Sequence, residues 1–129
     1  MPRRNPPTFL MVFQEEYERI SLKYPLGRNE QLVLNLCMTR CEYGGEVPLT
    51  HAEMARIIGI AASEVSRVMK KLAGCGYVLR EPSDKGNQWR YRLPTTIFHR
   101  GPLEELPWRR HKDMVAISGQ RNSVKRDNS

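Results

Sequence analysis

Short hydroxyl side chains and basic side chains share one face of a helix that the sequence predicts over residues 62–73. That face carries Ala62, Ser63, Glu64, Ser66, Arg67, Lys70 and Lys71. Small hydroxyls beside Arg and Lys suit close approach to a phosphate backbone and to base edges, whereas a solvated helix usually carries Glu and Lys. The other face repeats apolar residues at i, i+3, i+4 and i+7: Val65, Val68, Met69 and Leu72. The pattern favours a helix that contacts a polyanion, and the alternative is an ordinary helical hairpin.

A second helix is predicted directly before this one. Thr50 and Glu53 have the spacing of a capping box, in which each side chain satisfies a free backbone amide at the start of a helix. Gly59 ends this helix, because glycine tolerates a positive φ. Two helices joined through Gly59 and Ile60 form a helix-turn-helix unit, whose second helix can enter the major groove of duplex DNA. Arg67 is the residue expected to read a guanine, while Thr50, Lys70 and Lys71 are expected to meet phosphates.

A β-hairpin is predicted immediately after the 62–73 helix. Strands at 77–80 and 89–93 flank a turn-rich loop at 82–87. In the second strand the residues alternate between two faces, Trp89, Tyr91 and Leu93 against Arg90 and Arg92. With Lys85 in the loop, the two arginines add positive charge beside the helix, or they form only a solvated strand face.

The first half of the chain supplies the elements that position this unit. A short apolar strand is predicted over 9–13, a short helix over 15–24, a helix over about 30–42 with Asn29 as its N-cap, and an extended piece over 47–49. Cys37 and Cys41 lie four residues apart on one helix, a spacing that suits metal binding. Without a recognisable fourth ligand, buried core thiols are favoured.

Composition places the chain among ordinary globular proteins. Its 129 residues allow one domain, with a net charge of +7. The basic excess is concentrated in residues 50–101, where nine basic residues stand against four acidic ones. No apolar run reaches the length of a membrane span and the N-terminus lacks an apolar leader, so we expect a cytoplasmic protein without a membrane partner. We predict a disordered arm over 1–8, a winged-helix DNA-binding domain over 9–101 and a basic, largely disordered tail over 102–129.

Residues 49–81, LTHAEMARIIGIAASEVSRVMKKLAGCGYVLRE, resemble winged helix-turn-helix regulators. More narrowly, FLMVF at 9–13 and LPTTIFHRG at 93–101 resemble segments of the winged-helix replication initiators of small plasmids and related phages. Leu93 stands where that family usually has Asn, and Ala61 stands where most such proteins have a Ser or Thr cap. The resemblance implies an α+β, mainly α, winged-helix fold with an N-terminal strand and helix. It also implies DNA contacts by Ala62, Ser63, Ser66, Arg67 and Lys70, with Lys85 or Arg90 from the wing.

These observations predict a sequence-specific double-stranded DNA-binding protein that initiates or controls plasmid replication. The alternatives are a winged-helix transcriptional repressor and a protein-interaction winged helix that does not touch DNA. We expect no catalytic activity and no cofactor, since the chain has no P-loop, no nucleophile elbow and no HExxH motif. A homodimer is expected, because one recognition helix and wing read too few base pairs. Residues 9–13 and the helix after them are candidates for the dimer contact, or they pack within one chain.

Overall fold

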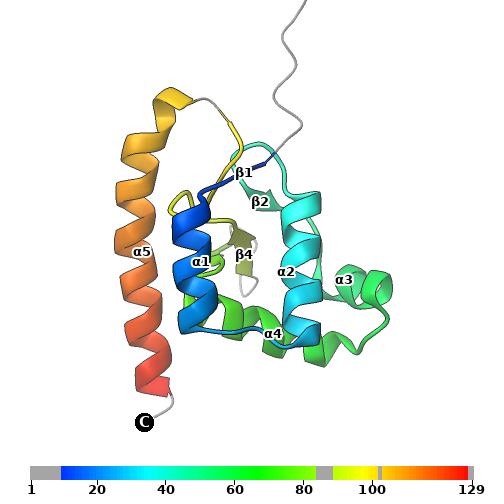
Figure 1. Ribbon diagram of the computed structural model, residues 1–129. Coiled ribbons are helices and arrows are strands. Elements are labelled where there is room, and N and C mark those ends of the chain that lie inside the picture. Colours follow the sequence, from blue (N-terminus) through cyan, green and yellow to red (C-terminus); the bar gives the residue numbers. More distant parts are fainter. Residues whose placement is uncertain (1–9, 84–88, 102, 128–129) are drawn as a thin grey trace, which may run out of the picture.

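The computed structural model describes residues 10–83, 89–101 and 103–127. Figure 1 shows the helices surrounding small antiparallel sheets. In chain order the elements are β1 (Met11–Val12), α1 (Gln14–Lys23), α2 (Arg28–Arg40), β2 (Glu46–Val47), α3 (His51–Ile58), α4 (Ala62–Cys75), β3 (Leu79–Pro82), β4 (Trp89–Arg92), β5 (Phe98–His99), a 3₁₀ turn (Leu103–Glu105) and α5 (Leu106–Asp127). Among the described residues, no helix is both long and apolar enough to cross a membrane.

The core lies between α1, α2, α3, α4 and the hairpin. Val33, Leu34, Val65, Val68 and Leu72 are fully buried in it, so the apolar face of α2 meets the predicted apolar stripe of α4. The phenol of Tyr77, at the end of α4, donates hydrogen bonds to the carbonyls of Ile20 at 3.3 Å and Tyr24 at 2.9 Å. These bonds fix the C-terminal end of α1 against the end of α4.

The caps of the helix-turn-helix unit follow the predicted chemistry. The Thr50 hydroxyl accepts from the Glu53 amide at 3.1 Å, and the Glu53 carboxylate accepts from the Thr50 amide at 3.2 Å. Gly59 ends α3 with φ of 85°, and Gly76 ends α4 with φ of 98°, both conformations that favour glycine. The Asn29 cap is wrong: α2 begins at Arg28 after Gly27, whose amide donates to the Glu30 carboxylate.

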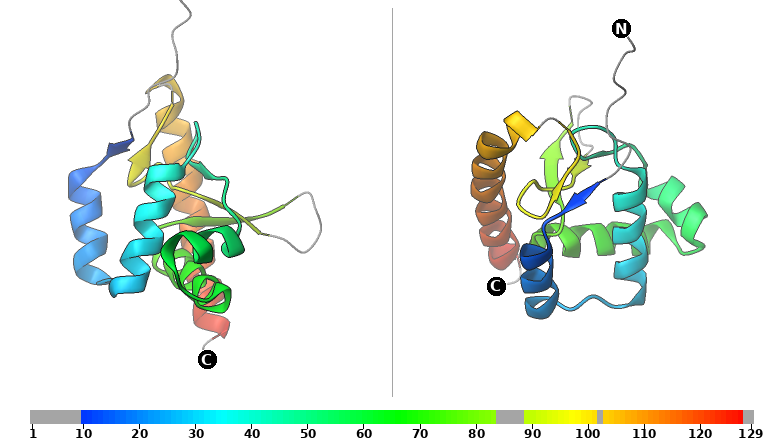
Figure 2. Two further views of the ribbon diagram at one scale, coloured as in Figure 1. Left: turned by 90° about the vertical axis from the view of Figure 1, so that its right-hand side faces the viewer. Right: turned by 45° about the horizontal axis from the view of Figure 1, so that its top comes forward.

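The predicted wing is present and gains a third strand. β4 pairs antiparallel with β3, which places Arg80 opposite Tyr91, and with β2, which places Val47 opposite Tyr91. The hairpin projects from the body of the molecule (Figure 2). The order of three helices followed by a hairpin confirms the α+β, mainly α, winged-helix fold.

The N-terminal strand packs within its own chain. β1 pairs antiparallel with β5, with Met11 opposite His99 and Val12 opposite Phe98. The Phe13 amide donates to the Ile97 carbonyl at 2.8 Å. Of the two roles considered for residues 9–13, the described part therefore has the intramolecular one. Phe9 and the predicted arm over 1–8 lie outside the described residues.

The prediction of a largely disordered tail is wrong for the described residues, because 106–127 form helix α5. Its sequence has few apolar residues, but three residues on one face of the helix, two of them polar, contact the domain. Asp113 and Ile117 are buried, and the Gln120 amide donates to the carbonyls of Ala73 at 3.0 Å and Val78 at 3.2 Å. Trp108 is 58% exposed on this helix.

Asp113 is the strongest contact between α5 and the wing. Its carboxylate accepts hydrogen bonds from both terminal nitrogens of Arg92, at 3.0 and 2.8 Å. It also accepts from the amide and the hydroxyl of Thr95, at 2.8 and 2.7 Å. Burial alone would raise the pKa of Asp113, but the bonds from Arg92 and Thr95 hold it below its ordinary value. The ion pair therefore stays charged at neutral pH.

We predict that Asp113→Ala lowers the free energy of unfolding by about 2 to 4 kcal/mol, because it removes the main partner of a largely buried guanidinium. Urea denaturation at neutral pH measures the loss. Glu104→Ala, an exposed change just before α5, should leave the unfolding free energy within about 0.5 kcal/mol of the unmodified protein. Equal stabilities for the two variants would show that α5 does not brace the wing.

Candidate nucleic-acid interface

The exposed face of α4 carries the residues that the sequence predicted for it. Ala62, Ser63, Ser66, Arg67, Lys70 and Lys71 are all exposed, and Thr50 is exposed at the start of α3. In the part of the chain that the structure describes, Lys70 forms no ion pair. The helix has no covering element on this side in Figure 1, so the face is open to a partner.

Arg67 is paired along its own helix. Its guanidinium donates to the Glu64 carboxylate at 3.0 and 2.6 Å, one turn earlier. These bonds lower the pKa of Glu64, which is therefore ionised. The Arg67 side chain is 57% exposed, so the pair is a weak surface salt bridge that a phosphate or a guanine can replace.

Ser66 is fixed by His51 at the start of α3. The Ser66 hydroxyl and His51 Nδ1 are hydrogen bonded at 2.8 Å, which joins the start of α3 to the middle of α4. The His51 ring also lies 5.4 Å from the Tyr91 ring of β4, centroid to centroid. Burial lowers the pKa of His51 below its ordinary value, so the ring is neutral at physiological pH.

Lys71 has a structural partner. Its ammonium donates to the buried carboxylate of Glu30 on α2 at 2.8 Å. The bonds from Lys71 and from the Gly27 amide lower the pKa of Glu30. Lys71 therefore ties the recognition helix to α2, and removing it would leave a buried carboxylate without its cation.

The two faces of the wing have different neighbours. Tyr91 lies against His51, so its face of the hairpin is turned toward α3, and the cross-strand partner Arg80 shares that face. Arg92 is on the opposite face, under α5. Its side chain is 18% exposed and is held by Glu81 at 2.9 Å and by Asp113. Both hydrogen-bonding ends of Arg92 are therefore occupied inside the protein, an arrangement that does not favour the predicted DNA contact by Arg92.

Arg80 and Trp89 form a feature of the wing that the sequence analysis missed. The Arg80 guanidinium lies 4.2 Å from the Trp89 ring centroid, and Trp89 is 50% exposed instead of facing the core. Trp89 is exposed because it pairs with Pro82 at the outer end of the hairpin, beyond the helices. Arg90 is exposed and 3.8 Å from Glu46, while Lys85 lies outside the described residues.

Cys37 and Cys41 are core residues, as predicted. Cys37 and Cys41 are buried free thiols, and burial raises the pKa of Cys37 to about 12. Among the described residues no cluster of His, Cys, Asp and Glu is arranged to hold a metal ion.

Comparison with known proteins finds a family match for part of the chain. Residues 28–85 match the family described as the Crp-like helix-turn-helix domain. The structure is similar to that of a MarR family protein from Bacillus stearothermophilus, with 19% identity, a TM-score of 0.42 and coverage of 86% of this chain and 66% of that one. It is also similar to disulfide-formed AbfR, with 19% identity, a TM-score of 0.41 and coverage of 84% and 64%. Among curated proteins, none matches the chain.

The helix-turn-helix order and the wing define the class of fold: the chain contains a winged helix-turn-helix domain. The chain spans just under two thirds of the length of the two solved proteins described above. The resemblance to plasmid replication initiators gains no support from these matches.

The burial of His51, which lowers the pKa of its ring, predicts a pH dependence of stability. The unfolded chain takes up a proton near pH 6.5 that the folded His51 resists, so stability should be present above about pH 6.5 and should fall as the pH drops through it. Urea denaturation across this range measures the slope. His51→Gln should flatten it, whereas His111→Gln, on the exposed side of α5, should not. Identical slopes in all three proteins would exclude His51 as the source.

Proposed function

We propose that this protein is a sequence-specific duplex-DNA-binding transcription regulator. The observation that carries the proposal is the open face of α4, which exposes hydroxyl and cationic side chains. On this helix Ser66 is bonded to His51 and Lys71 to Glu30, so the position of the face is fixed. A helix with this composition in a helix-turn-helix unit is suited to the major groove. The match of residues 28–85 to a helix-turn-helix family supports it.

In this proposal Arg67 reads a base and Lys70 meets a phosphate. Arg67 exchanges the Glu64 carboxylate for the two acceptors of a guanine, which match its planar fork. Ser63 and Ser66 allow the helix to approach closely, with Ser66 already oriented by His51. In the same proposal, Thr50 and the wing residues Arg80 and Arg90 meet the DNA backbone on either side of α4. Lys71 is assigned to the Glu30 contact in place of DNA.

Repression of transcription is the output that we favour over initiation of plasmid replication. The family match is to a helix-turn-helix domain and brings no initiator with it. Both outputs use the same DNA contacts and differ in where the bound site lies and what else assembles there. Repression of a reporter, measured beside origin-dependent plasmid maintenance, separates them.

We predict that Arg67→Ala weakens binding to the preferred duplex by about 1 to 3 kcal/mol and relaxes selectivity at one base pair. Lys70→Ala should weaken all duplexes alike and should reduce the slope of log affinity against log salt by about 1. Fluorescence anisotropy on preferred and scrambled duplexes at several salt concentrations gives both quantities. Arg40→Ala, exposed at the far end of α2, is the matched control and should change neither.

Equal losses on both duplexes for Arg67→Ala would make Arg67 a phosphate contact. Affinity that does not respond to salt would exclude DNA as the partner, because neutralised phosphates release counterions. Lys71→Ala is unsuitable for this comparison, since it also disturbs the buried Glu30.

A homodimer on an inverted repeat remains a prediction. One α4 and one wing touch only a few base pairs, and two copies would place half-sites about one helical turn apart or a multiple of it. Light scattering at tens of micromolar and the saturation stoichiometry on the preferred duplex measure it. One chain per site, from a protein that is monomeric in solution, would exclude the dimer.

A further inference from the structure

The hydrogen bond between His51 and Ser66 reaches the exposed face of α4 from the start of α3. It joins ring atom Nδ1 to the Ser66 hydroxyl oxygen at 2.8 Å. Ser66 belongs to the face on which the proposed function places its base contacts, and the inference drawn here rests on that function. A hydroxyl has one proton and two lone pairs, so a proton donated to His51 leaves only lone pairs for an outside partner. The direction of the bond therefore decides what Ser66 offers to a base.

Burial of the ring allows His51 to accept this proton. It lowers the pKa of His51, so the ring is neutral at physiological pH and one of its two nitrogens is an acceptor. Among the described residues, the Ser66 hydroxyl has no hydrogen-bond partner besides Nδ1, and the other ring nitrogen, Nε2, has none. With the ring proton on Nε2, the Ser66 proton is accepted inside the protein. Nε2–H is then left to donate to an acceptor outside it.

Three elements fix the ring before any partner binds. The capping box of Thr50 and Glu53 holds the backbone at the start of α3. The Tyr91 ring lies 5.4 Å from the His51 ring, with an angle of 40° between the two planes. Tyr91 is itself buried, in the middle strand of the wing sheet. Because α3, α4 and β4 each contribute a contact, the ring and the Ser66 hydroxyl keep their relative orientation.

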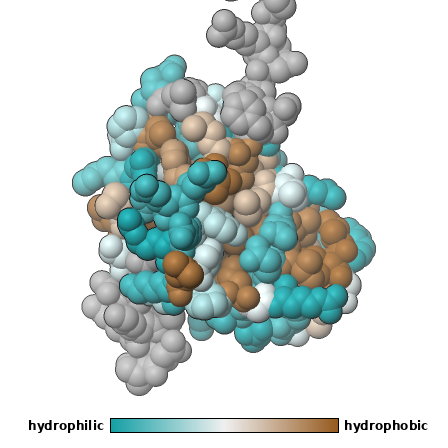
Figure 3. Space-filling model, in the orientation of Figure 1, coloured by the Kyte–Doolittle hydropathy of each residue, from teal (hydrophilic) through white to brown (hydrophobic). Residues whose placement is uncertain are grey.

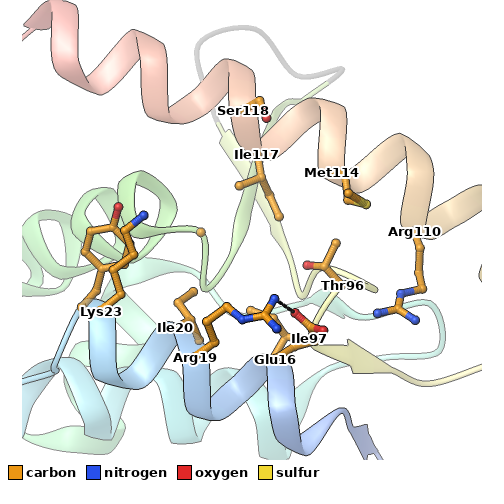
Figure 4. Close-up of a pocket in the computed structure, with 12 residues that line it drawn as sticks. Glu16, Arg19, Ile20, Lys23, Thr96, Ile97, Arg110, Met114, Ile117 and Ser118 are labelled. Atoms are coloured by element: carbon orange, nitrogen blue, oxygen red, sulfur yellow. Dashed lines mark hydrogen bonds and ion pairs between the residues drawn. The ribbon is translucent and has the colours of Figure 1, made fainter.

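The contact between His51 and Ser66 lies at the hydrophilic surface of α4. Figure 3 shows hydrophilic side chains along the lower edge of the molecule, where α4 runs. A cavity of about 450 Å³ between α1 and α5 is a separate feature (Figure 4), and neither His51 nor Ser66 lines it. Ser66 is exposed and His51 is partly exposed. Both are therefore accessible from the side that the proposed function turns toward DNA.

We propose that His51 sets Ser66 to read an amino-bearing base, adenine or cytosine, through the lone pairs of its hydroxyl. The Ser66 proton is donated to Nδ1, and Nε2–H of the same ring donates to a phosphate beside the one that Thr50 meets. In the other tautomer Nε2 would turn a lone pair toward the negative phosphate, so the phosphate contact selects the proton on Nε2. His51 is thus a positioning residue, which acts on the base through Ser66.

The major groove offers Ser66 and Arg67 different partners. Adenine N6 and cytosine N4 carry amino groups there, whereas guanine presents the acceptors O6 and N7 and thymine presents O4. Arg67 has only donors and needs the acceptors of a guanine. Ser66, with its proton held by His51, needs an amino group. Two consecutive residues of α4 therefore select opposite hydrogen-bonding groups, and neither can replace the other.

The first arm of the experiment determines the tautomer by long-range ¹⁵N–¹H NMR on the labelled full chain, free and on the preferred duplex, at about pH 7.5. The shifts of the two ring nitrogens separate the two neutral tautomers and the cation. The sequence has three histidines, and the signal missing from His51→Leu belongs to His51. We expect a protonated Nε2 and an unprotonated Nδ1 in both states. A proton on Nδ1, in the free protein or on the duplex, would overturn the proposal.

The second arm measures base preference by fluorescence anisotropy. Sequence selection with the unmodified and Ser66→Ala proteins first locates the base pair that Ser66 reads, and four duplexes then differ only there. We expect adenine or cytosine on the contacted strand to bind about threefold to tenfold more tightly than guanine or thymine. His51→Leu should lose this preference and keep the preference at the Arg67 position, whereas a purely structural loss would weaken all four duplexes alike. His111→Leu, exposed on α5, is the matched control and should keep both preferences.

Melting temperatures establish that each variant is folded before its titration. A preference for guanine or thymine at the Ser66 position would overturn the proposal. So would an unchanged preference in the His51→Leu protein, or a Ser66→Ala protein that selects the unmodified motif. A folded protein that binds no duplex contradicts the proposed function and the base reading with it, while the NMR spectrum of the free protein still decides the direction of the bond between His51 and Ser66.

Discussion

The buried ion pair between Arg92 and Asp113 holds the parts of this molecule together. It joins the second wing strand to α5, and the same carboxylate bonds Thr95 in the segment that leads to β5 and hence to the N-terminal strand. A charge pair in such a place is stabilising only when both partners have all their hydrogen bonds, and here Glu81 supplies the remaining acceptor for the guanidinium. The orientation of the wing relative to α4 therefore depends on a helix outside the helix-turn-helix unit.

The recognition helix is anchored by its neighbours while its tip stays open. Glu30 binds Lys71, His51 binds Ser66, and Glu64 binds Arg67. Only the last of these pairs joins two side chains of the same helix. The first two fix the position of α4, while Arg67 and Lys70 remain available. Preorganisation of this kind lowers the entropy cost of binding.

The sequence predicted most of the helices and the wing because those elements depend on local patterns: the capping box, the glycine caps and the apolar stripe of α4. It failed where tertiary contacts decide. Residues 106–127 have few apolar side chains, so nothing local shows that Asp113 meets Arg92 across the fold. The alternation in 89–93 was correct, but which face α5 covers could not be read from it. For the same reason Arg92 was assigned to DNA, and Arg80, His51 and Glu30 were missed.

Selection of bound sequences from a random duplex pool at near-physiological salt tests the central claim most directly. If α4 reads bases through Arg67, the unmodified protein enriches a defined motif containing a G·C pair, and the Arg67→Ala protein enriches a motif in which that position is lost. A pool that stays random after repeated rounds with the folded, unmodified protein would contradict the account.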